Sequence, residues 1–517
     1  MPNGSRRHLH ANRMRKLITD VYHVAVVREQ DTDFGEISSV PVDEPDILPS
    51  KHLTNVDHLT TDQQAALSNL LDEYADCFSS KPGLCTVMQH EINTTADFEP
   101  KRTRAYRVPE VLKGEIEQQI DELLNLDFIE PSDSPMTSGV VCVTKPDKSV
   151  RLCCDYRYLN KFTVPDAMPM PILMDCVHKV SRANFISICD AKSGFWQLLI
   201  KPQDRWKSAF VTHHGVWQWK RMPFGLKNAP GTFVRLMRSL LHSIRDSSEA
   251  YIDDSYTFSS DFESHLMHLK KFLSVIRGAG LTLNFHKCQF AQTRVPFVGY
   301  IVGSGGFVPD PSKIEAIKNM KEPQTKTEVR RALGVFSFYR SHVKDFARIA
   351  QPLTDLTGGK TPSQFQLGTK EKEAFIELKS RISRAPVLAS PRFGEPFCLY
   401  TDASQFAVGC CLAQSDDRGI EFPVAYASQR LTSTQNAWST VEKEAYAVIW
   451  AVTKFRTIVF GAQITVYSDH NPLRFLAECA PKSAKLTRWA LALQEFDISV
   501  KYKKGSANTL ADGLSRI

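Results

Sequence analysis

The sequence contains no apolar run approaching the ~18 residues that a membrane-spanning helix needs. None of its 12 cysteines forms a Cys-x-x-Cys pair, which argues against a zinc knuckle or finger. The basic N-terminus is not followed by an apolar segment, so it does not resemble a secretory signal. Internal repeats and low-complexity tracts are also missing. These absences argue against membrane-spanning, secreted and repeat proteins, and they favour reduced thiols in an intracellular protein.

What is present is the composition of a large globular chain. It has 517 residues, of which 42% are hydrophobic and 23% are charged. At about 150 residues per domain, this length predicts three or four domains. The net charge of +7 is mildly basic, which is compatible with a nucleic-acid partner without requiring one.

The pattern along the chain predicts a mixture of helices and strands. Residues 1–50 are typical of a linker, because a basic start is followed by seven acids and no base between Glu29 and Asp46. A helical pattern begins at about Leu59, with Thr61 as the candidate cap of the predicted helix. The other expected helices cover 111–129, 228–244 and 440–455. Hairpins are expected over 139–155 and 251–258, strands over 185–189, 196–200 and 464–469, and a β-meander over 397–429.

A first set of carboxylates stands at strand ends. Asp190 directly follows the apolar strand FISIC, and Asp253 and Asp254 lie in YIDDSY between two β-rich arms. Acids gathered at such positions repel one another unless a cation neutralises them, and a pair of Mg²⁺ ions is the usual solution in phosphoryl transfer. Ordinary turn chemistry is the competing interpretation, because Asp is common in turns.

A second set of carboxylates lies near the C-terminus: Asp402, Glu444, Asp469 and Asp512. Asp402 and Asp469 end two predicted strands, while Asp512 follows in NTLADGLSR. Glu444 falls on the apolar stripe of its predicted helix, whereas Glu442 points elsewhere. The alternative interpretation is that the four acids share no function. That interpretation explains the position of Glu444 on a buried helix stripe least well.

The order of several motifs resembles the Pol polyproteins of gypsy-class LTR retrotransposons. The polymerase-like motifs are VRLCCDYRYLN, DAKSGFWQLLI, MPFGLKNAPGTF, YIDD and FVGYIVGSGGF, and the RNase H-like motifs are TDAS, EKEAYAV, YSDHNPL and NTLADGLSR. The resemblance implies an α+β multidomain fold: a right-hand polymerase with fingers, palm and thumb, a connection segment and an RNase H-like α/β domain. The expected divisions are a linker (1–50), a lead-in (51–110), fingers and palm (111–305), thumb or connection (306–390) and RNase H (391–517).

The resemblance also assigns roles in the polymerase part. Asp190, Asp253 and Asp254 match the catalytic triad that holds two Mg²⁺ ions. Arg151 matches the fingers arginine that contacts the incoming dNTP, and an Arg fork suits phosphate oxygens; Lys148 is a second candidate. Further dNTP-contacting candidates follow from the same comparison: Phe195, at the position of the sugar gate, and Phe224, in MPFG. Core packing is an equal alternative for Phe195.

In the RNase H-like part, the resemblance implies that Asp402, Glu444, Asp469 and Asp512 hold two Mg²⁺ ions for cleavage of the RNA strand of an RNA–DNA hybrid. The loop histidine that retroviral enzymes carry before the last acid is missing from KYKKGSANTLAD. His470 is a weak candidate for that role.

The implied function is RNA- and DNA-directed DNA synthesis with RNase H activity. The partners would be an RNA template, a DNA primer and an RNA–DNA hybrid, together with either other Pol or Gag products or a second copy of the chain. The expected location is the cytoplasm or a virus-like particle, with possible access to the nucleus. No membrane partner is expected. The alternatives are a catalytically inactive or domesticated nucleic-acid-binding fragment, and a nuclease with a decayed polymerase. Neither Asp-Thr-Gly nor Asp-Ser-Gly occurs, so no aspartic protease is expected within these residues.

Overall fold

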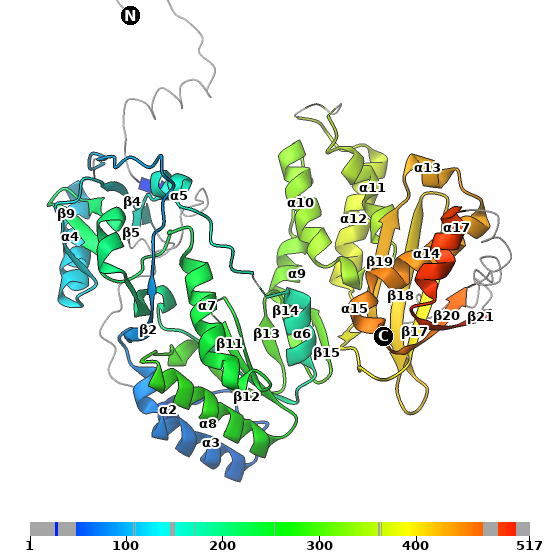
Figure 1. Ribbon diagram of the computed structural model, residues 1–517, viewed down its shortest axis with the longest axis horizontal. Helices are drawn as coiled ribbons and strands as arrows, with labels where there is room; N and C mark the ends of the chain where they lie inside the picture. Colours follow the sequence, from blue (N-terminus) through cyan, green and yellow to red (C-terminus); the bar gives the residue numbers. More distant parts are fainter. Residues whose placement is uncertain are drawn as a thin grey trace, which may run out of the picture. The chain divides into compact units, whose positions relative to one another are not determined.

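The computed structural model describes residues 26–28, 48–106, 108, 110–144, 150–169, 171–252, 254–359, 362, 364–468 and 484–502. These residues form two compact units (Figure 1). The first unit holds the described residues up to Ile172 together with Phe185–Gln292, and the second holds Leu173–Asn184 and the described residues from Thr293 onward. Within the described ranges, no helix is both long and apolar enough to cross a membrane.

The first unit is built around two main sheets. Its strands are β1 (Val26–Arg28), β2 (Cys85–His90), β3 (Ile129–Pro131), β4 (Ser138–Thr144), β5 (Val150–Cys154), β6 (Phe185–Asp190), β7 (Leu198–Ile200), β8 (Phe210–Val211), β9 (Val216–Trp219), β10 (Ser248–Tyr251), β11 (Asp254–Ser259) and β12 (Gln289–Gln292). Its α-helices are α2 (Pro49–His52), α3 (Thr61–Glu73), α4 (Glu110–Asn125), α5 (Arg157–Phe162), α7 (Ala229–Leu241) and α8 (Phe262–Gly278).

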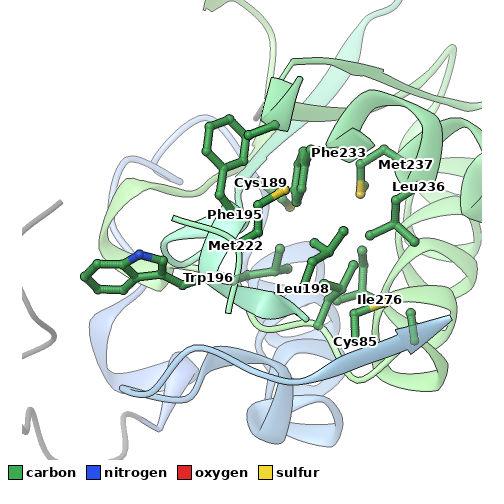
Figure 2. Close-up of a cluster of buried hydrophobic side chains, with 14 of the residues drawn as sticks. Cys85, Cys189, Phe195, Trp196, Leu198, Met222, Phe233, Leu236, Met237 and Ile276 are labelled. Atoms are coloured by element: carbon green, nitrogen blue, oxygen red, sulfur yellow. The ribbon is translucent and has the colours of Figure 1, made fainter. Parts of the chain in front are cut away.

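One sheet has the order β1-β4-β8-β9-β3, with β5 paired to β4, and the other has the order β10-β11-β6-β12. The predicted hairpin over 139–155 is confirmed by β4 and β5. A continuous apolar core supports both sheets, and Figure 2 shows part of it, including Phe195, Trp196, Phe233 and Met237.

Two local predictions in this unit were wrong. The cap of α3 is Thr60 and not Thr61, because Thr60 forms a reciprocal capping box with Gln63. Thr61 also has a Gln three residues on, Gln64, so this spacing alone does not distinguish the two threonines. The strand predicted over 196–200 covers only Leu198–Ile200, because Gly194–Gln197 form a 3₁₀ turn. Ser193, with a φ of 49°, turns the chain just before it.

The second unit contains a small sheet, a group of helices and a larger sheet. The small sheet joins β13 (Val295–Phe297), β14 (Tyr300–Gly303), β15 (Gly306–Pro309) and β16 (Leu388–Ala389) in that order. The helices near it are α6 (Leu173–Ser181), α9 (Pro311–Lys318), α10 (Lys326–Phe338), α11 (Phe346–Asp355) and α12 (Thr369–Ser383).

The larger sheet has the order β19-β18-β17-β20-β21. Its strands are β17 (Phe397–Ala403), β18 (Ala407–Ser415), β19 (Glu421–Arg430), β20 (Gln463–Ser468) and β21 (Asp497–Tyr502), with helices α13 (Ser433–Asn436), α14 (Thr440–Lys454), α15 (Arg456–Val459) and α17 (Ala484–Leu493). The first three strands form the predicted antiparallel meander, while β17, β20 and β21 run parallel. The parallel strands need a helical crossover, which α14 provides between β19 and β20.

Candidate active sites

The sheet of the first unit brings Asp190 and Asp254 directly opposite each other. Asp190 is the last residue of β6 and Asp254 is the first residue of β11, and the antiparallel register pairs them. Residues paired in this way carry Cβ atoms about 5 Å apart, so both carboxylates stand at one edge of the sheet. The predicted meeting of these two acids is therefore confirmed, while Asp253 lies outside the described residues.

The hairpin beside them has a strained tip. Tyr251 of β10 pairs with Asp254 of β11, so only two residues connect the strands. Ile252, the first of the two, has a φ of 56°. A β-branched side chain disfavours this left-handed conformation, and such strain gathers at functional sites. The surrounding sheet holds the turn against this preference.

The electrostatics of this edge are those of crowded carboxylates. Burial and the neighbouring charge of Asp190 raise the pKa of Asp254, while the hydroxyl of Tyr256 donates to its Oδ2 at 3.2 Å. Lys287 Nζ lies 3.2 Å from Asp190 Oδ2 and offsets part of the negative charge. Oxygen donors that repel one another in this way are suited to a hard divalent cation such as Mg²⁺.

A buried histidine connects the same two strands. His265 of α8 is fully buried, and its Nε2 lies 2.8 Å from Ser187 Oγ on β6 while its Nδ1 lies 3.2 Å from Ser259 Oγ on β11. Burial lowers the pKa of His265 to about 4. The neutral ring thus ties together the strands that carry Asp190 and Asp254. The sequence analysis missed it, although the apolar spacing of α8 places His265 on its buried stripe.

The structure describes the predicted dNTP contacts only in part. Arg151 lies in β5 opposite Val143 of β4, but its side chain and all of Lys148 lie outside the described residues. Phe195 is 7% exposed and packs against Phe224 and Phe233, with ring centroids 4.9 and 5.8 Å away. The core-packing interpretation of Phe195 therefore holds, and its role as a sugar gate stays a prediction.

In the second unit, Glu444 contacts the backbone at the end of β17, at the residue that follows Asp402. Glu444, only 3% exposed, accepts a hydrogen bond from the backbone N–H of Ala403 at 3.1 Å, next to the exposed Asp402. The predicted position of Glu444 on the buried stripe of α14 is confirmed. Glu442 instead closes the capping box of α14 with Ser439 and pairs with Lys485 at 2.7 Å.

The neighbouring strand reaches the same edge of the sheet. Tyr400 of β17 pairs with Tyr467 of β20, and their rings stack at 4.8 Å and 8°. The parallel register brings the C-terminal ends of both strands to one edge of the sheet. Asp402 lies two residues after Tyr400 and therefore on the same face of β17. Asp469 follows β20 directly in the sequence; it, His470 and Asp512 lie outside the described residues.

The helices before this sheet add two charged residues that the sequence analysis missed. Asp345 and Arg348, at the start of α11, line a cavity of about 70 Å³ together with Asp402, Ser404 and Gly409. Ser428 Oγ accepts a hydrogen bond from Ala347 N at 2.8 Å. Figure 1 shows α11 beside β19, which carries Ser428. No periodicity could have revealed this pairing, because it joins residues about eighty positions apart.

Two known families match separate parts of the chain. Residues 143–302 match the family described as reverse transcriptase (RNA-dependent DNA polymerase), and residues 392–496 match the RNase H-like domain found in reverse transcriptase. Asp190 and Asp254 fall in the first range, and Asp402 and Glu444 fall in the second. Reverse transcriptases use divalent metal ions.

The similar proteins of known sequence come from transposons. The chain is 38% identical over 475 residues to the retrovirus-related Pol polyprotein from transposon opus of Drosophila melanogaster, which covers 88% of this chain and 47% of that polyprotein. It is 32% identical over 442 residues to the Pol polyprotein from transposon gypsy of the same fly, with 82% and 42% covered. The chain thus spans less than half the length of these relatives.

Solved structures of foamy viral protease-reverse transcriptase share the fold. One in complex with double-stranded DNA has a TM-score of 0.80 and 25% identity, covering 91% of this chain and 83% of that chain. Another in complex with an RNA/DNA hybrid has a TM-score of 0.72 and 25% identity, covering 91% and 64%.

Proposed function

We propose a function for this chain, which belongs to the reverse transcriptase and RNase H region of LTR retrotransposon Pol polyproteins. It copies RNA and DNA templates into DNA and cleaves the RNA strand of the resulting hybrid. The observation that carries the polymerase proposal is the register that sets Asp190 opposite Asp254 at the edge of the palm-like sheet. The strained turn at Ile252 supports it, because that turn precedes Asp253 in the sequence.

The residues at this edge are suited to binding two Mg²⁺ ions. Asp190, Asp253 and Asp254 would hold them. Burial, and after it the charge of Asp190, raises the pKa of Asp254, and a bound cation would oppose both effects by favouring the charged carboxylate. Bound Mg²⁺ would supply charge stabilisation for attack of a primer 3′-hydroxyl on the α-phosphate of a dNTP. The protein itself positions the carboxylates through β6, β11 and the buried His265.

Substrate binding in the polymerase part would involve Arg151 for the triphosphate, together with Lys148, three positions earlier in the sequence. Phe195 and Phe224, which pack on each other, would form the wall beside the dNTP sugar. A bulky ring at that position excludes a ribose 2′-hydroxyl by steric conflict.

For the RNase H activity, Asp402, Glu444, Asp469 and Asp512 would hold two further Mg²⁺ ions, which would activate a water for attack on the RNA strand. Glu444 fits this role because its carboxylate is held next to Asp402 by the backbone of Ala403. We also propose the domain divisions given above: fingers and palm over 111–305, thumb or connection over 306–390, and RNase H over 391–517.

The test is extension of a DNA primer on a labelled RNA template in the presence of Mg²⁺, with matched Asn variants of each centre. Asp254→Asn should abolish extension and leave cleavage of a preformed hybrid, and Asp402→Asn should do the reverse. Asp416→Asn, at an exposed turn outside both centres, is the control. Extension retained in Asp254→Asn would overturn the polymerase assignment.

A catalytically inactive nucleic-acid-binding protein is the second candidate, because the net charge of +7 is compatible with a nucleic-acid partner whether or not catalysis occurs. Folded protein that binds a hybrid tightly but shows no Mg²⁺-dependent turnover, with or without an added second copy, would favour it.

A further inference from the structure

A group of metal-ligating side chains lies in the first unit on elements that carry none of the catalytic carboxylates. Glu117 of α4 faces the turn between β8 and β9, which carries His213 and His214. His213 Nε2 lies 3.1 Å from Glu117 Oε1, and His214 Nε2 contacts the same oxygen. One ligand atom from each residue lies within 4.8 Å of the other two.

The turn that presents the two histidines is held in shape by its own hydrogen bonds. Thr212 N–H donates to Gly215 O at 2.9 Å, which closes the turn around the two rings. Thr212 Oγ1 also accepts from Trp217 Nε1 at 3.2 Å. Successive residues of a strand point to opposite faces, but this turn sends both rings toward α4, with their centroids 4.2 Å apart.

The donor set separates this group from the catalytic carboxylates. Two imidazoles and one carboxylate suit a borderline-soft first-row metal ion, above all Zn²⁺, whereas Mg²⁺ prefers oxygen donors alone. A tetrahedral Zn²⁺ with ligands at about 2.0–2.1 Å sets neighbouring donor atoms about 3.3 Å apart. The 3.1 Å between His213 Nε2 and Glu117 Oε1 is close to that spacing.

We propose that Glu117, His213 and His214 form a binding site for a Zn²⁺-class divalent ion, with water completing the tetrahedral shell. The site would link α4 to the β8–β9 hairpin across 96 positions of sequence. It would therefore cross-link two parts of the first unit and act independently of the catalytic Mg²⁺ ions.

The test uses the full chain, stripped of metal by a chelator and returned to buffer with excess Mg²⁺, which occupies the carboxylate centres. Co²⁺ is titrated as a spectroscopic probe, and Zn²⁺ is then added in competition. We expect one saturable Co²⁺ site with the absorption of a tetrahedral nitrogen–oxygen shell, displaced by Zn²⁺.

Variants connect that signal to the three residues. Loss of an outer-shell partner already weakens metal binding by about 10–100-fold, so Glu117→Gln, His213→Ala and His214→Ala should each weaken Zn²⁺ binding by at least about tenfold. The matched controls are Glu110→Gln on the same helix and His242→Ala at an exposed position.

Hydrogen exchange provides a second readout in case an alanine variant distorts the turn. Zn²⁺ should slow exchange in residues 110–125 and 210–219 of the native chain and not in Glu117→Gln, which keeps the shape of the side chain. Wild-type affinity in all three variants would overturn the proposal, as would the absence of saturable Zn²⁺ binding under excess Mg²⁺; the second result would leave the three residues as an ion pair only.

Discussion

Acidification should destabilise both units, because each unit buries two histidines among the residues that the structure describes. Burial lowers the pKa of His90 and His265 in the first unit to about 4. In the second unit it lowers the pKa of His178 to about 4 and that of His342 to about 3. An unfolded histidine titrates near pH 6.5, so between these limits the unfolded chain binds protons that the folded chain does not.

The sign and the size of the effect follow from this difference. Because the folded pKa is the lower one, the stability contribution is complete above about pH 6.5 and is lost as the pH falls toward 4. Each histidine contributes about 1.4 kcal/mol per pH unit. The two buried histidines of each compact unit together give a loss of about 3 kcal/mol in the free energy of unfolding for each step of one in pH. This is a large part of the roughly 5–15 kcal/mol that stabilises a typical domain.

The assay is urea unfolding, followed by tryptophan fluorescence and circular dichroism, between about pH 7.5 and 5.5. Carboxyl groups titrate mostly below about pH 4.5, so this window reports the histidines. A chelator keeps metal binding from contributing. A free energy of unfolding that is constant to about 1 kcal/mol across this window would refute the reasoning.

His265→Gln isolates one contribution. Gln does not titrate, and it can replace one of the hydrogen bonds to Ser187 and Ser259. The variant should therefore be less stable at pH 7.5 but lose about 1.4 kcal/mol per pH unit from the slope of the first unit. His242→Gln, at an exposed position, controls for the substitution itself. An unchanged slope in His265→Gln would contradict the assignment.

Three further predictions concern packing around the sites. Gly409→Ala would place a methyl group 2.9 Å from Asp345 Oδ1, at the end of a side chain that can shift. We expect a loss of about 1 kcal/mol in stability and weaker hybrid cleavage, with primer extension unchanged. Thr60→Ala removes the capping box of α3 and should cost about 1 kcal/mol in urea unfolding. A double-mutant cycle of Tyr400→Leu and Tyr467→Leu should give a coupling energy of about 1 kcal/mol for the stacked pair.

Each of these has a direct control. Gly334→Ala in α10 meets no atom within 4 Å, so equal losses in Gly334→Ala and Gly409→Ala would rule out the contact with Asp345 as the cause. Thr61→Ala tests the cap, because it should cost less than Thr60→Ala. A coupling energy near zero would show that the two tyrosines contribute independently.

The carboxylate positions could be predicted from the sequence because local pattern determines them. Asp190 ends an apolar strand, and Glu444 falls on a helix stripe, so their faces follow from periods of two and 3.6 residues. The pairing of Tyr251 with Asp254 is also local, because so short a connection between β10 and β11 fixes which of their residues face each other. The register that sets Asp190 opposite Asp254 joins two separate strands, β6 and β11, and no local pattern determines it.

The parts that could not be predicted depend on contacts between distant segments. Asp345 reaches Gly409 because α11 packs on β19, and Glu117 reaches His213 across 96 positions. Neither pairing leaves a periodic signal in the sequence. The shortened strand over 196–200 is a different case, because the left-handed Ser193 imposes a 3₁₀ turn that β-rich composition cannot reveal.

The placement of α6 has a consequence for how the chain must be made. This helix precedes β6 in the sequence but belongs to the second unit, where Gly305 N–H donates to Ser181 O at 2.8 Å. During synthesis its apolar residues, including Val177 and Val180, emerge more than a hundred residues before β14 and β15, which cover them. At an elongation rate of about 5–20 residues per second, a ribosome-bound chain therefore exposes the apolar face of this helix for many seconds. This exposure favours chaperone binding or aggregation at that stage. For the same reason, no single cut divides the chain into two halves that could each fold alone.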